Sequence, residues 1–198
     1  MTNKYLLEYM QQENAALSHR PGFERMMLKV MARDHMVQEY AWAVPTAEAI
    51  WALVAYSPIL EIGAGRGYWA SQVAEDGGEV HCYDNAVEGD LIKCYSTGEL
   101  VSTYHPVKPC TGSEYLNSKD MTLFLCWPPY DNPMAYDALT EYLKNGGKRL
   151  VYVGEGNGGC NATDDFFRLL DSKMERKDSI RIPQWEGIHD WMEVYELK

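Results

Sequence analysis

The apolar positions of this chain change their spacing near residue 40. Before that point they recur at helical intervals, which predicts two helices within residues 3–37, separated by Pro21-Gly22. The second helix carries one methionine-rich apolar face: Phe23, Met26, Met27, Val30 and Met31. Because methionine commonly fills irregular gaps in cores, we expect this face to be buried; an adaptable binding surface is the alternative.

From Tyr40 onward, short strand-like apolar runs alternate with amphipathic helical runs. This alternation predicts an α/β fold with a mostly parallel sheet covered by helices on both faces. The expected strands are Ile59–Ile62, Glu79–Tyr83, a weak one at Val101–His105 that Pro106 ends, Met121–Cys126, Arg149–Val153, Arg176–Ile182 and Trp191–Glu196. The expected helices are one capped by Thr46 that runs to about Tyr56, and then Gly67–Glu75, Met134–Lys144 and Thr163–Leu170. No helix separates the last two strands, so we expect them to pair antiparallel.

These elements divide the chain into an N-terminal helical extension, residues 1–39, and one α/β domain, residues 40–198. The formal net charge of −11 repels phosphate backbones, so duplex nucleic acid is not expected as a partner. Five cysteines without a CxxC pair suggest neither a disulfide framework nor a metal site. The chain starts without a basic segment followed by an apolar run, and nothing reaches the ~20 apolar residues of a membrane helix. We therefore expect a cytoplasmic protein.

The clearest motif is PILEIGAGRG, residues 58–67, an apolar strand that ends in glycines and opens a helix. Glycines let the backbone turn tightly and approach a ligand, and the free N–H groups of a helix start attract a carboxylate. The motif resembles motif I of the class I (Rossmann-like) methyltransferases that use S-adenosyl-L-methionine (SAM). The resemblance implies that the following residues bind SAM: Glu61, Gly63, Ala64, Gly65 and Gly67.

Two alternatives compete with this interpretation. A dinucleotide fingerprint would need a third glycine at position 68, where this chain has tyrosine, and a glycine triplet can also be a plain tight turn. The next strand favours SAM, because it ends in Asp84, 17 positions after Gly67, where a carboxylate accepts both ribose hydroxyls. We expect Asp84 to bind the ribose, with Tyr83 and Asn85 near the adenine; otherwise Asp84 only starts a turn.

A second motif, Trp-Pro-Pro-Tyr at 127–130, follows the fourth strand. It resembles motif IV of amino-methyltransferases, in which asparagine or aspartate precedes Pro-Pro-Tyr. The indole N–H of Trp127 donates and cannot accept, so the usual side-chain acceptor is missing. We expect the backbone carbonyls of Trp127 and Pro128 to accept from the methyl acceptor, and Trp127 and Tyr130 to sandwich a flat one. In the alternative, the prolines merely end a strand.

Ligands of open α/β sheets bind outside the carboxyl ends of the strands, which brings further loops into consideration. In the loop Pro183–Asp190, His189 is a candidate general base, with a structural bond to Asp190 as the alternative. The glycine-rich loop Gly154–Cys160 suits a substrate loop or a mobile surface loop. The segment Tyr40–Pro45 resembles one that closes over SAM in related enzymes, unless its aromatic residues dock the N-terminal helices.

Taken together, EIGAGRGYWA, WPPY and IPQWEGIHD resemble a branch of the class I methyltransferase superfamily over about residues 40–198. The resemblance implies a seven-stranded, mostly parallel sheet with an antiparallel last strand. It also implies SAM-dependent transfer of a methyl group to a nitrogen or oxygen of a small or flat acceptor. The alternatives are a nucleic-acid amino-methyltransferase, against which the acidic charge counts, and a non-catalytic SAM-binding or interaction module.

Overall fold

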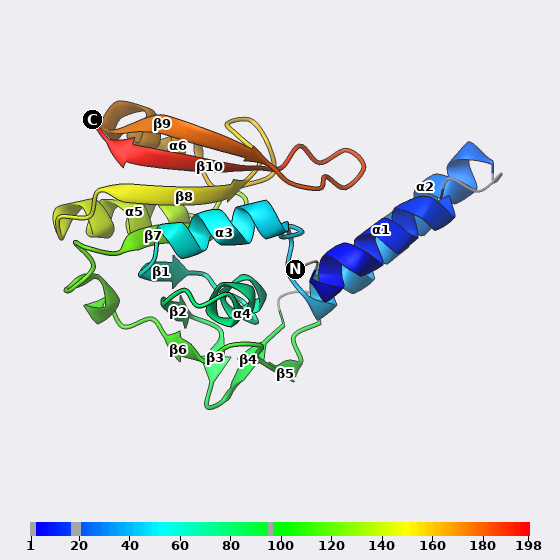
Figure 1. The fold of residues 1–198 in the computed structure, drawn as a ribbon, viewed down its shortest axis with the longest axis horizontal. Coiled ribbons are helices and arrows are strands. Elements are labelled where there is room, and N and C mark those ends of the chain that lie inside the picture. The colour runs from blue at the N-terminus through cyan, green and yellow to red at the C-terminus, as the bar shows by residue number, and fades with distance from the viewer. Residues whose placement is uncertain (1–2, 17–20, 95–96) are drawn as a thin grey trace.

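The computed structural model describes residues 3–16, 21–94 and 97–198. A seven-stranded sheet with the order β6-β2-β1-β7-β8-β10-β9 forms its centre (Figure 1). Its strands are β1 (Ile59–Ile62), β2 (Val80–Asp84), β6 (Val107–Pro109), β7 (Thr122–Cys126), β8 (Arg149–Gly154), β9 (Met174–Arg181) and β10 (Trp191–Leu197). The five strands from β6 to β8 are parallel, and β10 is antiparallel to both of its neighbours. This is the predicted class I methyltransferase fold.

Helices cover both faces of the sheet, as predicted. Helices α3 (Ala47–Ala55) and α4 (Tyr68–Glu75) pack on one face, and α5 (Met134–Lys144) and α6 (Asp164–Lys173) pack on the other. Successive strand residues point to opposite faces, so Phe124 of β7 joins the first layer while Leu123 and Leu125 join the second. The predicted cap of α3 is confirmed, since the Thr46 hydroxyl accepts the Ala49 N–H at 3.2 Å.

The predicted strand at Val101–His105 is wrong as a member of the main sheet. Its first residues form β5 (Leu100–Ser102) of a separate antiparallel sheet with the order β3-β4-β5. The other two strands are β3 (Val87–Glu88) and β4 (Leu91–Lys93), and a short 3₁₀ helix, η1 (Ser113–Tyr115), follows later. The main-sheet strand is instead β6, which starts just after Pro106. As an edge strand that pairs only with β2, β6 tolerates neighbouring prolines.

The N-terminal helices α1 (Lys4–Ala16) and α2 (Gly22–Glu39) form a hairpin that projects from the sheet domain (Figure 1). At its base a cluster of aromatic and apolar side chains packs on the domain: Tyr5, Met36, Tyr40, Val44, Tyr68 and Trp185. Beyond the base, the methionine-rich face of α2 is exposed, so the prediction that it is buried is wrong. The hairpin extends past the domain, and the described residues leave that face uncovered. None of the described helices combines the length and apolar character needed to cross a bilayer.

One buried hydroxyl provides a test of the fold. Tyr142 of α5 is fully buried, and its hydroxyl lies 2.7 Å from the Met121 carbonyl and 2.8 Å from the Arg149 carbonyl. The same oxygen accepts the Lys148 and Arg149 N–H groups, each at 3.1 Å. Tyr142→Phe leaves these backbone groups unpaired, so we expect a loss of about 1–3 kcal/mol and a melting temperature lower by roughly 2–12 °C. Thermal unfolding measures this; Tyr136→Phe on the same helix, at an exposed position, should change nothing.

Candidate functional site

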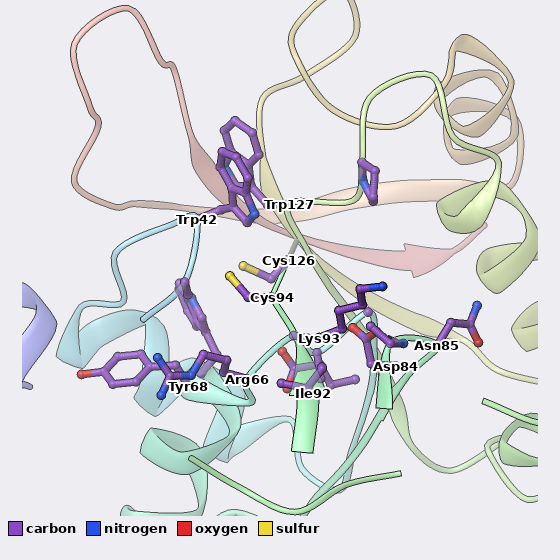
Figure 2. Close-up of a pocket in the computed structure, with 18 of the residues that line it drawn as sticks. Trp42, Arg66, Tyr68, Asp84, Asn85, Ile92, Lys93, Cys94, Cys126 and Trp127 are labelled. Carbon is purple, nitrogen blue, oxygen red and sulfur yellow. Dashed lines mark hydrogen bonds between the residues drawn. The ribbon is translucent and has the colours of Figure 1, made fainter. Parts of the chain in front are cut away.

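A cavity of about 530 Å³ opens at the carboxyl ends of β1, β2 and β7 (Figure 2). The glycine turn, the start of α4, the end of β2, the small sheet and the end of β7 all contribute to its wall. The segment from the end of α2 to Trp42 completes it. The cavity therefore lies where ligands bind in open α/β sheets.

The glycine turn presents bare backbone to this cavity. Gly63, Gly65 and Gly67 have φ angles of 73°, 53° and 69°, in the left-handed region that glycine adopts without strain. A Cβ on Gly63 would lie 2.6 Å from the methyl carbon of Met134, whereas a Cβ on Gly65 would meet open space. Gly63 and Gly65 line the cavity, and Gly67 instead caps the start of α4. The turn thus has the shape of a ligand cradle.

Asp84 fixes this turn to the end of β2. One carboxylate oxygen accepts the Gly65 N–H at 2.9 Å, and the other accepts the Ala86 N–H at 2.8 Å. The turn-forming alternative from the sequence is thereby realised. Each oxygen keeps a second lone pair, however, and Asp84 lies on the cavity wall together with Asn85. Tyr83 does not line the cavity; it is half-buried and packs at the margin of the apolar cluster to which α5 and α6 contribute.

Glu61 is the unusual group of the site. Its side chain is only 2% exposed, it lines the cavity, and burial raises its pKa to about 8. Its one described polar partner is the Cys82 thiol, whose sulfur lies 3.4 Å from Oε2. Within the described part of the chain, no cationic side chain forms an ion pair with it. A buried carboxylate of this kind is costly unless a positive group reaches it.

Two indoles form the wall on the side away from Asp84 and Asn85 (Figure 2). The rings of Trp42 and Trp127 stack with centroids 4.9 Å apart and planes 10° from parallel. Trp127 has a positive φ of 53°, and its indole N–H donates to Asp190 Oδ1 at 2.9 Å. The other Asp190 oxygen is buried without a partner in the described structure, and burial raises the Asp190 pKa to about 7.

Two residues of the Trp-Pro-Pro-Tyr motif, Pro128 and Tyr130, lie outside the cavity. The Pro128 carbonyl already accepts from Asn161 Nδ2 and the Ala162 N–H, each at 3.2 Å, so it is not available to a substrate. Tyr130 is 70% exposed and does not line the cavity, so no sandwich with Trp127 forms. Two backbone hydrogen bonds with Ala162 hold this segment: the Ala162 N–H donates to the Pro128 carbonyl, and the Asp131 N–H donates to the Ala162 carbonyl at 3.0 Å.

His189 is also outside the cavity, and its side chain is 78% exposed. Its partner is Glu155, not the expected Asp190: Glu155 Oε1 accepts the His189 backbone N–H at 2.9 Å and lies 3.3 Å from Nδ1. Although burial opposes it, hydrogen bonds from the Cys160 and His189 N–H groups hold the pKa of Glu155 below its usual value. This pair joins the two rim loops.

The sequence prediction missed several lining residues. The small sheet contributes Ile92, Lys93 and Cys94, and no recognised motif marks that segment. Arg66, the unassigned position of the glycine motif, donates to the backbone carbonyls of Glu39 at 2.6 Å and Ser102 at 3.0 Å. Trp42 belongs to the Tyr40–Pro45 segment and lines the cavity. Tyr40 of the same segment stacks on Tyr5 of α1, as the docking alternative predicts.

No protein-family model matches the chain, and no curated protein matches it. Solved structures with a similar fold include the magnesium protoporphyrin IX methyltransferase of Synechocystis with bound SAM, at 10% identity and TM-score 0.48, covering 96% of this chain and 91% of that one. A TehB-like SAM-dependent methyltransferase of Corynebacterium glutamicum has 17% identity and TM-score 0.44, covering 75% and 87%. A Streptococcus pneumoniae protein assigned as a tRNA (m1A22) methyltransferase has 15% identity and TM-score 0.46, covering 78% and 71%. At these similarities, the strand order itself is what identifies the fold of this chain.

Proposed function

We propose that this chain is a SAM-dependent methyltransferase that binds SAM along the glycine turn and methylates a small, flat, uncharged acceptor beside Trp42 and Trp127. The observation that carries the proposal is Glu61, a buried carboxylate without a cationic partner on the wall of a cavity with a glycine cradle. SAM can supply the missing positive charge, because its methionine half carries an ammonium group and its sulfur is a sulfonium.

The other groups of the wall fit the remaining parts of the cofactor. Bare backbone at Gly63 and Gly65, next to the start of α4, suits the methionine carboxylate. The free lone pairs of Asp84 suit the ribose hydroxyls, and Asn85 lies next to them on the same wall. When bound, SAM supplies a methyl group on an already activated sulfonium.

The acceptor side is suited to a flat, uncharged molecule. Trp42, Cys126, Trp127 and Pro129 line it, and all four side chains are uncharged. Of the described lining residues, the two basic ones are Arg66, which is bonded to backbone carbonyls, and Lys93. This arrangement and the net charge of −11 disfavour a polyanionic acceptor such as nucleic acid. The sandwich expected of an amino-methyltransferase of nucleic acids is likewise not formed by Tyr130.

The chain contributes to the reaction chiefly by alignment. Holding two reactants in line contributes up to about 7–11 kcal/mol to a displacement of this type. The stacked indoles orient the acceptor ring, and the hydrogen bond from the Trp127 indole to Asp190 fixes the position of that indole. The acidic lining residues, Glu61 and Asp84, belong to the cofactor side, so the described lining places no carboxylate on the acceptor side as a general base. A neutral nitrogen fits this site best, because its lone pair attacks before any proton is removed.

Ligand binding to the folded state tests the cofactor assignment directly. S-adenosylhomocysteine (SAH) or SAM should raise the melting temperature, whereas NAD should not. Gly65→Val should abolish the shift, because its methyl groups would occupy the open space where the ligand approaches. Gly77→Val is the matched control, since Gly77 also has a positive φ and open space but lies outside the cavity. An equal shift with NAD, or none with SAM and SAH, would refute the assignment.

The protonation of Glu61 makes SAH affinity depend on pH. The pKa of Glu61 is raised from 4.5 to about 8. The protonated carboxyl group therefore contributes to the stability of the ligand-free folded protein below pH 4.5, and this contribution is lost as the pH rises from 4.5 to about 8. The ammonium of SAH favours the ionised form, so binding should release a proton and tighten by up to about tenfold per pH unit between pH 6 and 8. Calorimetry in buffers of different ionisation enthalpy measures that proton. Glu61→Gln should bind about tenfold or more weakly, without proton release. A Kd of SAH that stays the same across this pH range in the unaltered protein would contradict this role.

Turnover with labelled SAM tests the acceptor site across a panel of small aromatic amines, phenols, nucleosides and single-stranded oligonucleotides. For an acceptor found in this way, Trp42→Ala should lower kcat/KM about tenfold by removing a stacking surface, while the Kd of SAH hardly changes. Trp42→Phe should restore part of the loss, and Tyr130→Ala should have no effect. If Tyr130→Ala is as damaging as Trp42→Ala, the acceptor binds on the outer side of the Trp-Pro-Pro-Tyr segment. SAH binding without turnover of any acceptor would favour the non-catalytic module.

A further inference from the structure

The projecting hairpin carries an apolar stripe that the proposed methyl transfer does not use. On α2 the exposed side chains recur at intervals of three and four residues: Phe23 (73% exposed), Met26 (44%), Met27 (44%), Val30 (48%) and Met31 (63%). At 100° per residue these five positions lie on one side of the helix. Exposed contiguous apolar surface of this kind is unusual on a monomer and typically marks an interface.

Between Phe23 and Met31 the charged residues of α2 lie outside this stripe, and Asp34, about one turn further on, marks its end. Lys29, at the side of α2 that faces α1, forms ion pairs with Glu13 at 3.2 Å and with Glu186 of the domain at 3.3 Å. Tyr9 of α1 donates to the Gln184 carbonyl at 3.0 Å, which fixes the base of the hairpin to the same loop. The hairpin is thus held in place by its other faces, and the stripe points away from the described part of its own chain.

Charge is divided unevenly between the hairpin and the domain. Residues 1–40 contain five lysine or arginine residues and five aspartate or glutamate residues, so the whole net charge of −11 falls on residues 41–198. Two copies of the domain repel each other, whereas two hairpins do not. Since the hairpins project from the domains, they are the parts of two copies that can meet without that cost (Figure 1).

The stripe is also complementary to itself. In a two-fold antiparallel crossing centred on Met27, Phe23 of one copy faces Met31 of the other, four residues on either side of the centre. Sulfur–aromatic contacts of this type are favourable, and an isologous interface needs just such a self-complementary pattern. A charged partner would gain nothing from a neutral apolar stripe.

We propose that the stripe of α2 is a dimer interface and that its occupant is the same stripe on a second copy of this chain. The area is small for a permanent complex, so the dimer is weak, with a dissociation constant on the order of micromolar. Raising the salt concentration strengthens it modestly by screening the repulsion between the two domains.

Sedimentation velocity over a wide protein concentration range tests the proposal, at low and at high salt. The full chain should shift from monomer to dimer, and the double variant Met27→Glu, Met31→Glu should weaken association by about a hundredfold or more, because it buries unpaired charges. Leu28→Glu is the matched control. Leu28 is an exposed apolar residue of the same helix, 39% exposed, but lies about 100° from Met27 and about 60° from Met31, beyond the edge of the stripe, so its variant should weaken association far less than the double variant.

Circular dichroism establishes that the hairpin stays helical, and Met27→Gln with Met31→Gln repeats the test without charge should the glutamates unfold it. A monomer at every concentration and salt overturns the proposal. So does a dimer that Leu28→Glu weakens as much as the double variant does, since the interface would then lie elsewhere. Association that salt weakens strongly would point to a charged interface and overturns it as well.

Discussion

Two hydrogen bonds to Asp84 hold together the part of the molecule on which the cavity depends. The bond to Gly65, at 2.9 Å, fixes the glycine turn after β1 to the end of β2, and the bond to Ala86, at 2.8 Å, shapes the turn that follows β2. The turn adopts left-handed backbone angles that only glycine accepts easily, so its shape comes from sequence and its position from the carboxylate. Arg66, the next residue, then ties the same turn to the base of α2 and to the small sheet. The loops that surround the cavity are thereby fixed to one another before any ligand arrives.

The fixed position of Glu61 explains why burial raises the pKa of its carboxyl group. A carboxylate in a mobile loop could turn to water, but Glu61 belongs to β1, a strand that is buried along its whole length. It is paired in register with β2 on one side and β7 on the other. The ligand-free protein therefore retains an acid whose ionised form is disfavoured by burial, and a cationic ligand relieves that cost. We propose that recognition of a cationic ligand follows from this same placement.

The sequence predicted most of the sheet and the position of the glycine turn, because both follow from local patterns. Apolar runs placed the main strands, and glycine spacing placed the turn at 63–67. Long-range contacts were not predictable in this way. The position of the Trp-Pro-Pro-Tyr segment and the availability of the Pro128 carbonyl both depend on hydrogen bonds with Asn161 and Ala162, which lie more than 30 residues further along the chain. The exposed face of α2 looked like core because periodicity reports that a face is apolar, not what covers it.

A crystal structure of the chain grown with SAH tests the central claim most directly. The account predicts the ligand along the glycine turn, with its ammonium within hydrogen-bond distance of Glu61 and a ribose hydroxyl bonded to Asp84. It also predicts open space between the ligand sulfur and the Trp42–Trp127 pair. A ligand bound elsewhere, or one whose ammonium points away while Glu61 remains without a cationic partner, would contradict it.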